Sequence, residues 1–328
     1  MPPDLPLTFL FGALLGLSAH RAGLCTVKAV AEVMTTGRAH VLWSFLKASL
    51  WTSGLLSLVA LAAIPPDLVA RPLTLVAPAG GLIFGIGAAL NGACSFSTFA
   101  RLAEGHVAMA ATPLGWMLGL AGMRALAPVA HPPTEVSALP LWIAVALIPW
   151  MLWEGSRIVR RLAAGGEGSL GAAVWPLSRA VFVLAAANVG LLLLGRPWSF
   201  TATAICATGT ADVAPCAHAG SLWLVSLVAI AAMVASARAR GSFRWRPMRL
   251  RAVLRHLAAG TLMGMGAAMI PGGNDGLILF GLPALSPHAA PAWIGIALGI
   301  LAALSAMRLA GLRVPPIRCE ADICRAGL

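Results

Sequence analysis

Long apolar segments, separated by short polar stretches, follow one another along almost the whole chain of 328 residues. A helix that crosses a membrane needs about 20 mostly apolar residues, and several of these segments reach that length. The pattern therefore predicts an all-α integral membrane protein with about nine transmembrane helices. The nine segments are Leu5–Leu17, Val41–Ile64, Pro78–Ala93, Val107–Pro128, Leu139–Trp153, Ala180–Gly195, Gly220–Ser236, Leu254–Ile270 and Ala289–Ala310.

Three of these segments, the first, the third and the eighth, are short or interrupted by glycine. At about 13 to 17 residues each, they are too short to cross a hydrocarbon core of roughly 30 Å. We therefore expect them to form half-helices or short re-entrant helices.

The composition indicates that lipid is the solvent. The chain is 59% hydrophobic and only 10% charged, whereas a soluble domain carries about a quarter of charged residues. Its net charge of +12 is also typical of nucleic-acid-binding proteins. Arginines beside membrane segments, however, follow from the tendency of cytoplasmic loops to carry basic residues and from attraction to anionic lipid. We expect a lipid bilayer and no nucleic acid as a partner.

Basic residues concentrate in every second connection between the apolar segments. If the N-terminus lies outside, 20 of the 23 Lys and Arg residues fall on one side, and only Arg71, Arg124 and Arg196 do not. Cytoplasmic loops carry the excess of basic residues in membrane proteins. The chain is therefore predicted to place its N-terminus outside and its C-terminus in the cytoplasm.

Related glycine patterns recur along the chain. Each ends where the chain is expected to turn sharply between two helices, and we call such a place a corner. Residues 11–26 match residues 80–95 at a constant offset of 69, and residues 79–99 match residues 258–278 at an offset of 179. A weaker fourth copy lies at Gly195–Thr201. Glycines four residues apart also let two membrane helices pack closely, so helix packing remains an alternative interpretation of the pattern.

In the predicted topology the first two copies end on the cytoplasmic side and the last two on the outside. This arrangement indicates inverted-repeat pseudo-symmetry within one domain, 1–328, whose halves are about 1–156 and 177–312. Short, glycine-interrupted segments at matching places in two halves point to a binding site near the middle of the membrane.

Each of the first two corners is expected to begin a second short helix. Thr26 follows Cys25, and Ser95 follows Cys94. The start of a helix carries partial positive charge and unpaired N–H groups, which favour an anion. Lys28 lies one turn after Cys25, where it would contact an anionic substrate or pair with Glu32 within the helix; both interpretations remain open.

The two corner thiols are the chemically soft groups of this pattern. An isolated free Cys is often a small buried hydrophobe, but Cys25 and Cys94 stand at equivalent places in a repeat. A thiol is a weak hydrogen-bond donor and acceptor, so it would hold a polarizable sulfur anion loosely enough to release it.

These corners, which carry Gly-x-Cys twice in the first half, resemble those of the YeeE/YedE family of sulfur (thiosulfate) transporters. The resemblance extends over most of the chain, and residues 79–99 are its most specific part. It implies an hourglass-shaped protein of the bacterial inner membrane with nine spanning helices. Short hairpin helices would meet at its waist, and thiosulfate would pass between cysteines, of which Cys25 and Cys94 match the first two.

The chain departs from the family at the last corner, where Gly273 occupies the position of a family cysteine and Asn274 follows it. The resemblance also implies a cytoplasmic sulfur-carrier protein as a partner. Repeat and resemblance together predict the substrate path. Its residues are Cys25, Cys94, Gly92, Ser95, Gly23, Thr26, Gly273, Asn274, Lys28 and Ser199.

The remaining cysteines form two pairs. Cys206 and Cys216 fall in a predicted outside loop, where an oxidising compartment permits a disulfide; a bridge or simple packing is favoured over a replacement for the missing thiol at Gly273. Cys319 and Cys324 lie in the cytoplasmic tail. A metal site there would lack further ligands, so we expect an ordinary reduced tail.

The function predicted from these features is uptake of a small sulfur-containing anion, with thiosulfate favoured, and no enzymatic activity. Without a Walker-type loop or facing histidines on a long span, we expect no cofactor and no metal. A pore for another small solute or anion is an alternative. A membrane thiol–disulfide oxidoreductase is a weaker one, because such proteins ordinarily use a C-x-x-C pair, which the chain lacks.

The predicted orientation is tested by reporter fusions. A reporter fused after Arg246 should read cytoplasmic, because seven arginines lie in that connection. A reporter inserted near Asp212 should read external. Opposite signals at both places would overturn the orientation and, with it, the inverted arrangement of the repeats.

Overall fold

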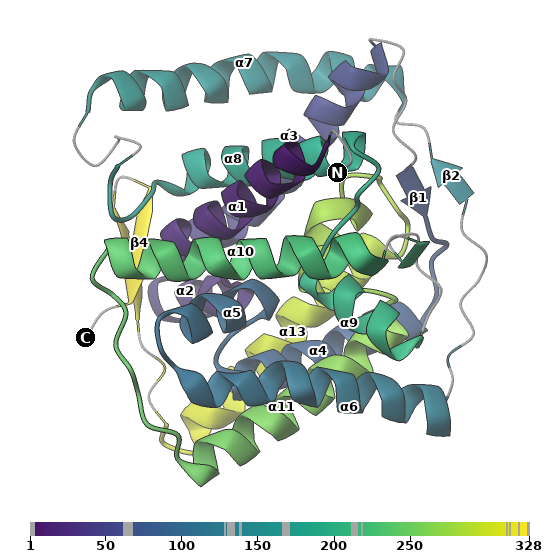
Figure 1. Ribbon diagram of the computed structural model, residues 1–328, viewed down its shortest axis with the longest axis vertical. Helices are drawn as coiled ribbons and strands as arrows, with labels where there is room; N and C mark the ends of the chain where they lie inside the picture. Colours follow the sequence, from purple (N-terminus) through teal and green to yellow (C-terminus); the bar gives the residue numbers. More distant parts are fainter. Residues whose placement is uncertain are drawn as a thin grey trace.

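The structure is a computed structural model of the chain, and it describes residues 4–61, 68–127, 129, 135–137, 140–165, 171–210, 216–217, 219–312, 314, 316–320 and 322–326. Each of the nine predicted apolar segments overlaps a long helix in the described residues (Figure 1). These helices are α1 (Leu5–Ala22), α3 (His40–Leu61), α4 (Val76–Asn91), α6 (Ala111–Leu126), α7 (Leu141–Ala163), α8 (Leu177–Leu193), α10 (Ala219–Ala239), α11 (Leu250–Met269) and α13 (Ala289–Leu309).

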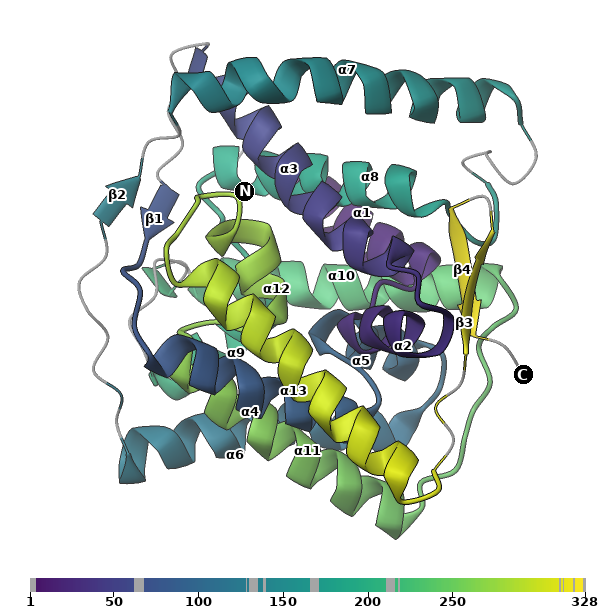
Figure 2. The same ribbon diagram turned by 180° about the vertical axis from the view of Figure 1, so that it is seen from behind.

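Four short helices follow four of the long ones and lie in the middle of the molecule in both views (Figures 1 and 2). They are α2 (Thr26–Thr36), α5 (Ser95–Ala103), α9 (Phe200–Thr208) and α12 (Asn274–Gly276). A π-helical turn, η4 (Leu277–Gly281), continues α12, and a 3₁₀ turn, η1 (Val107–Ala110), precedes α6. The short helices α5, α9 and α12 contact one another.

The first and eighth segments were predicted to be half-helices of about 13 to 17 residues, and this prediction was wrong because both helices are longer. Helix α1 has 18 residues and α11 has 20. Both extend into polar sequence that an apolar pattern leaves out, namely His20 and Arg21 at the end of α1 and Arg251 near the start of α11. Helix α4 has 16 residues, which agrees with the prediction for the third segment.

Five helical stretches of the described part are long and apolar enough to cross a membrane, and a sixth results if α11 and the bent segment after it are joined. The chain is thus a mostly helical, multi-pass membrane protein. The five stretches are Leu5–Thr36, His40–Leu61, Val76–Ala103, Ala219–Ala239 and Ala289–Leu309.

Extended structure is limited to two small antiparallel sheets in the described residues. Strand β1 (Leu68–Ala70) pairs with β2 (Glu135–Ser137). Strand β3 (Ile317–Glu320) forms a hairpin with β4 (Ile323–Ala326), in which Cys319 lies opposite Cys324.

Close helix packing explains much of the glycine pattern. A Cβ atom at Gly81 or Gly85 of α4 would collide with a backbone carbonyl oxygen of α13, and one at Gly260 or Gly264 would collide with a carbonyl oxygen of α6. Small residues at such crossings let helices in lipid approach closely. The packing interpretation of these glycines is therefore confirmed, and α4, α6, α11 and α13 form one tightly packed group.

Helix α7 lies at the edge of the molecule, beside α3 and α8 (Figure 1). A buried ion pair joins it to α3, where Lys47 Nζ donates to Glu154 Oε1 at 2.6 Å and to Ser178 Oγ of α8 at 2.9 Å. Lys47, one of the 20 basic residues counted on the cytoplasmic side, lies within α3 and not in a loop. A buried charge is tolerated here because it is paired and hydrogen-bonded.

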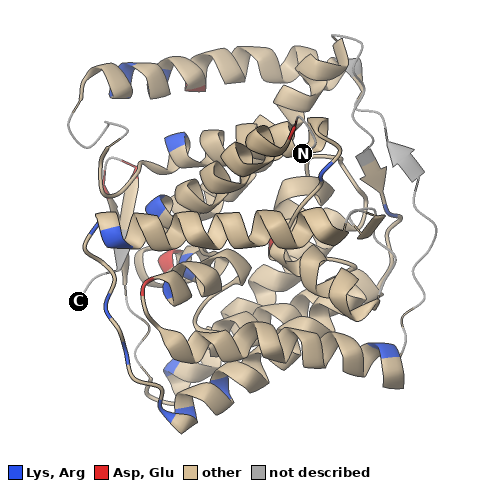
Figure 3. Cartoon of the chain, in the orientation of Figure 1, with Lys and Arg blue, Asp and Glu red and all other residues tan. Residues whose placement is uncertain are grey.

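Lys and Arg residues gather at one end of the molecule, around the β3–β4 hairpin (Figure 3). Of the three exceptions, Arg124 Nη1 donates to the Thr208 carbonyl at 2.6 Å, and Arg196 binds Asp4 at 2.8 Å. The concentration of basic residues on one side, on which the predicted orientation depends, is thus also seen in the folded molecule. Asp212, the proposed external reporter site, lies outside the described residues.

Candidate functional site

Four helix breaks share one backbone pattern. After each of α1, α4, α8 and α11, an N–H group donates to a carbonyl five residues back, as in the Schellman motif. The pairs are Leu24 to Ala19, Ala93 to Ala88, Arg196 to Leu191 and Gly272 to Ala267. Gly23, Gly92 and Gly195 adopt the left-handed conformation at these ends, which glycine tolerates without a steric penalty.

The next helix then begins at equivalent residues. The N-cap residues of α2, α5, α9 and α12 are Cys25, Cys94, Ser199 and Gly273, and the carbonyl of each accepts the first helical hydrogen bond. The prediction that each Gly-x-Cys corner begins a second short helix is confirmed. The weak fourth copy at Gly195 forms the same kind of break.

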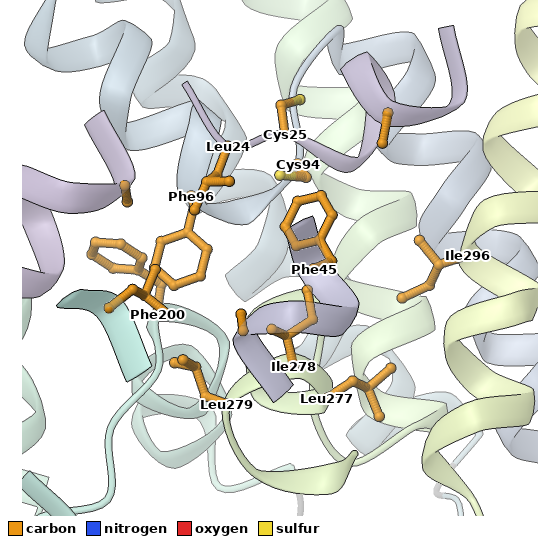
Figure 4. Close-up of a cluster of buried hydrophobic side chains, with 14 of the residues drawn as sticks. Leu24, Cys25, Phe45, Cys94, Phe96, Phe200, Leu277, Ile278, Leu279 and Ile296 are labelled. Carbon is orange, nitrogen blue, oxygen red and sulfur yellow. The ribbon is translucent and has the colours of Figure 1, made fainter. Parts of the chain in front are cut away.

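The first two breaks bring the two free cysteines together. Ser97 Oγ donates to Cys25 Sγ at 3.0 Å and lies 3.4 Å from Cys94 Sγ. The two thiols also contact each other, and Figure 4 shows them side by side. Cys94 is fully buried and Cys25 is 5% exposed. Residues 69 positions apart in the sequence therefore form one two-thiol centre.

Polar groups around this centre have unused hydrogen-bonding capacity. Thr26 Oγ1 and Ser95 Oγ are buried and have no hydrogen-bond partner among the described residues. Helices α2 and α5 also begin without a side-chain cap, which leaves N–H groups of their first turns available. A buried polar atom without a partner is costly, so this arrangement is suited to a guest that accepts hydrogen bonds.

A cavity of about 630 Å³ leads to the centre. Cys25 and Ser97 lie at its wall, together with the basic residues Arg21, Lys28, Arg101 and Arg240. We call this cavity the vestibule. Its basic lining gives it a positive potential, which concentrates anions.

Lys28 does not pair with Glu32, so the intrahelical ion pair was a wrong alternative. Its Nζ donates to the backbone carbonyl of Cys324 at 2.6 Å, and it lines the vestibule. The acidic residue of the vestibule is Glu104. Burial alone would raise the pKa of Glu104, but the neighbouring His20 and Arg240 side chains hold that pKa below its usual value.

A buried polar network fixes the second break. Asn91 Nδ2 donates to Thr98 Oγ1 at 2.9 Å, and Asn91 Oδ1 accepts from Thr112 Oγ1 at 2.8 Å. His256 Nδ1 of α11 lies 2.7 Å from the same oxygen. Contacts to α6 and α11 thus hold the end of α4, and with it Cys94, in a defined position.

The two breaks of the second half form a separate polar centre. Asp275 is fully buried and accepts hydrogen bonds from Thr201 Oγ1 at 2.5 Å and from Thr201 N at 3.1 Å. Ser199 Oγ accepts from Ala202 N at 3.0 Å and so caps α9. In contrast to α2 and α5, helix α9 begins with its side-chain cap in place and a carboxylate beside its first turn.

The last two predicted path residues lie at this second centre. Gly273 lies against Thr201, because a Cβ atom at Gly273 would fall within 3.0 Å of both Cβ and Oγ1 of Thr201. Asn274 Oδ1 accepts from Trp293 Nε1 at 3.1 Å, while its Nδ2 has no partner among the described residues. The predicted path residues thus fall into two groups, one at each centre.

Buried apolar side chains cluster next to the two thiols (Figure 4). Phe45, Phe96, Phe200 and Ile278 are at most 3% exposed. The rings of Phe96 and Phe200 lie 6.0 Å apart, edge to face. In this conformation the vestibule therefore reaches Cys25, and buried apolar side chains, which we call the hydrophobic barrier, lie beyond it.

Cys206 and Cys216 form a disulfide, with their Cα atoms 5.1 Å apart. The favoured interpretation of this pair is confirmed, and neither sulfur is a free thiol that could replace the one absent at Gly273. Cys319 and Cys324 are also joined by a disulfide in this structure, where the sequence suggested two reduced thiols.

Three residues of the vestibule and the second centre were not predicted as site residues from the sequence. Asp275 carries no motif signal beyond being an acid in an apolar region, which in a membrane protein marks a functional site. Arg240 and the tail residue Cys324 line the vestibule. Both are distant from Cys25 in sequence, and no local pattern connects them to it.

Comparisons with known proteins agree with these features. Residues 21–302 match the model of a family described as sulphur transport. A protein named probable transporter YedE, from Salmonella typhimurium strain LT2, is 33% identical over 118 residues, which are 36% of this chain and 29% of that protein. The matched region thus spans less than a third of that relative's length.

The contact between Gly273 and Thr201 leads to a stability prediction. Gly273→Ala should destabilise the protein by about 1–3 kcal/mol, because the new methyl group overpacks a filled site. The additional change Thr201→Ser removes the crowding Cγ2 atom but keeps the hydroxyl that binds Asp275, so it should restore most of the lost stability. Thermal unfolding in detergent measures both effects; equal melting temperatures for wild type and Gly273→Ala would refute the predicted contact.

Proposed function

The chain belongs to the sulphur transport family, and on this premise we propose that it takes up a small sulfur-containing anion, with thiosulfate favoured, along a path through Cys25 and Cys94. Its family and its YedE relative mark it as a membrane transporter and not an enzyme. The substrate and the path are our proposal.

The observation that carries this proposal is the convergence of groups at the two-thiol centre. Two free thiols, two uncapped helix starts and two hydroxyls without partners meet in one buried place. The N–H and O–H groups suit the oxygens of an oxyanion. The sulfur atoms suit the terminal sulfur of thiosulfate, because soft, polarizable atoms contact one another favourably.

The charge of the vestibule supports an anionic substrate. Arg21, Lys28, Arg101 and Arg240 face the same cavity as the acidic Glu104, which leaves an excess of positive charge. A cleft lined by one sign of charge raises the local concentration of the opposite ion and its rate of arrival. Thiosulfate, with two negative charges, would gain more from this potential than a neutral solute.

The hydrophobic barrier suggests how leakage is prevented. Phe45, Phe96, Phe200 and Ile278 leave little room for water beyond Cys94, and apolar constrictions block ions by excluding their hydration water. Passage would require these side chains to separate. The described conformation then corresponds to a state open toward the arginine-rich end and closed toward the other.

Orientation gives this state a direction. We place the arginine-rich end in the cytoplasm of a bacterial inner membrane, with the N-terminus outside and the C-terminus inside, because basic residues favour that side. The vestibule would then be the exit of the substrate into the cell. A cytoplasmic sulfur-carrier protein, implied by the family resemblance, would receive the substrate there.

The four equivalent helix breaks support an inverted-repeat arrangement. Two breaks lie in the first half of the chain and two in the second, and the halves meet through α5, α9 and α12. Transporters built from inverted repeats bind their substrates between such broken helices. We propose that the pseudo-symmetric halves, about 1–156 and 177–312, move against each other around the two centres.

The proposal is tested by uptake of radiolabelled thiosulfate in cells that lack their own importers. Cys94→Ala and Cys25→Ala should each lower the initial rate by about tenfold or more, equivalent to at least about 1.4 kcal/mol of lost stabilisation. Rates are normalised to the amount of folded protein in the membrane.

The matched control removes two sulfurs away from the path. The variant Cys206→Ala/Cys216→Ala should lose stability but retain uptake per folded molecule. Full uptake by the Cys25→Ala/Cys94→Ala double variant would disprove the thiol path and favour a pore in which the cysteines only pack. Absence of thiosulfate uptake in the wild type would show that another anion is the substrate.

A further inference from the structure

The C-terminal hairpin packs its two cysteines against helix α2. Cys319 and Cys324 lie opposite each other on β3 and β4 and are 9% and 5% exposed. The hairpin is attached to α2 by the Lys28 bond to the Cys324 carbonyl and by Ile317 N, which lies 3.4 Å from Thr35 Oγ1. Figure 2 shows the hairpin beside α2, although Ile317 and Thr35 are 282 positions apart in the sequence.

A buried carboxylate meets the cysteines at this contact. Glu32 of α2 is fully buried, and its Oε1 lies 3.1 Å from Cys319 Sγ. The same oxygen lies 2.9 Å from His40 Nδ1, while Oε2 accepts from Val41 N at 2.8 Å. No Lys or Arg forms a salt bridge with Glu32 among the described residues. A buried carboxylate is costly unless a cation or hydrogen bonds compensate its charge.

The arrangement supplies three ligands of a four-coordinate zinc site, and a water molecule would be the fourth. One ligand atom each from Glu32, Cys319 and Cys324 lies within 4.8 Å of the others, and all three residues are buried. Zinc binds thiolate sulfur at about 2.3 Å and carboxylate oxygen at about 2.0–2.2 Å. Small side-chain rotations would bring the three atoms to those distances from a common centre once the sulfurs are not bonded to each other.

We propose that the reduced hairpin binds one zinc ion through Cys319, Cys324 and Glu32. His40 holds the ligating oxygen in place, as residues next to a metal ligand commonly do. Two thiolates and a carboxylate around a doubly charged ion leave one negative charge, and Lys28 lies next to the hairpin to offset it. The sequence argument against a metal was the lack of further ligands in the tail, and the fold supplies one from α2.

The disulfide and the metal site are alternative states of the same two sulfurs. Cytoplasmic thiols are kept reduced, so the zinc form is the expected one if the hairpin lies inside; this step rests on the proposed orientation. A two-electron oxidant such as hydrogen peroxide would take one electron from each thiolate, and the S–S bond would form. With two protons from the solvent the peroxide would become two water molecules, and the ion, having lost both thiolate ligands, would be released.

Zinc would fasten the tail to the vestibule wall. Ile317 and Cys324 line the vestibule together with Lys28, and the ion would join their hairpin to the helix that begins at Cys25. Binding energy at a structural zinc site contributes directly to the stability of the segment it holds. The site is separate from the two-thiol centre, which uses Cys25 and Cys94.

The test is the metal content of the full-length protein. The chain, carrying a purification tag without histidines, is purified in detergent under anaerobic reducing conditions, loaded with zinc and dialysed. Elemental analysis should find about one zinc per chain, as for a structural site. Hydrogen peroxide should release it, and a dithiol reductant followed by zinc should restore it.

Variants separate this site from other thiols. Cys319→Ser/Cys324→Ser should bind essentially no zinc, and Glu32→Gln should bind it at least about tenfold more weakly, because metal ligands and their close partners change affinity by that factor or more. Cys25→Ser/Cys94→Ser and Cys206→Ser/Cys216→Ser should each retain one zinc. No zinc in the reduced wild type, or undiminished zinc in the tail variant, would overturn the proposal, whatever the transport assay shows.

Discussion

Interrupting a helix inside a membrane exposes backbone groups that lipid cannot satisfy, and this constraint governs the rest of the structure. The four breaks meet part of it in the same way, with an N–H bonded five residues back and an N-cap carbonyl that starts the next helix. The backbone groups that still lack partners are the N–H groups in the first turn of the helix after each break. Helices α4, α6, α11 and α13 pack tightly through glycine around these breaks, so that the exposed groups face protein and not lipid.

The two halves of the chain satisfy those remaining groups differently. In the second half, Ser199 caps α9, and the Asp275 carboxylate accepts from Thr201 N. In the first half, Cys25 and Cys94 provide no side-chain cap, and Thr26 and Ser95 have hydroxyls without partners among the described residues. The second half thus holds a built-in carboxyl group, whereas we propose that the first half binds an external anion.

This difference gives a physical reason for the departure at the last corner. A side chain at Gly273 would crowd Thr201, the residue that binds Asp275. A chain with a thiol at this position would need a different arrangement of the neighbouring helix start. The glycine at position 273 and the buried acid at position 275 are thus linked through Thr201.

Apolar segment length and glycine spacing predicted the long helices and the helix breaks, because both depend on local sequence. The equivalent places of Cys25 and Cys94 in the repeat indicated a shared role, but their direct contact is visible only in the folded structure. The partner of Lys28 did not, because Cys324 lies 296 residues away and only the folded tail brings it near. The lengths of α1 and α11 were underestimated for another reason. Segments defined by apolar residues leave out the polar residues at the ends of a helix.

The central claim is that the substrate occupies the two-thiol centre. Its most direct test is the rate at which a small membrane-permeant alkylating reagent modifies Cys25 and Cys94 in proteoliposomes, followed for each residue by mass spectrometry. Thiosulfate should slow modification of both residues, whereas sulfate, which has no terminal sulfur, should slow it much less. Equal rates with and without thiosulfate would contradict the claim.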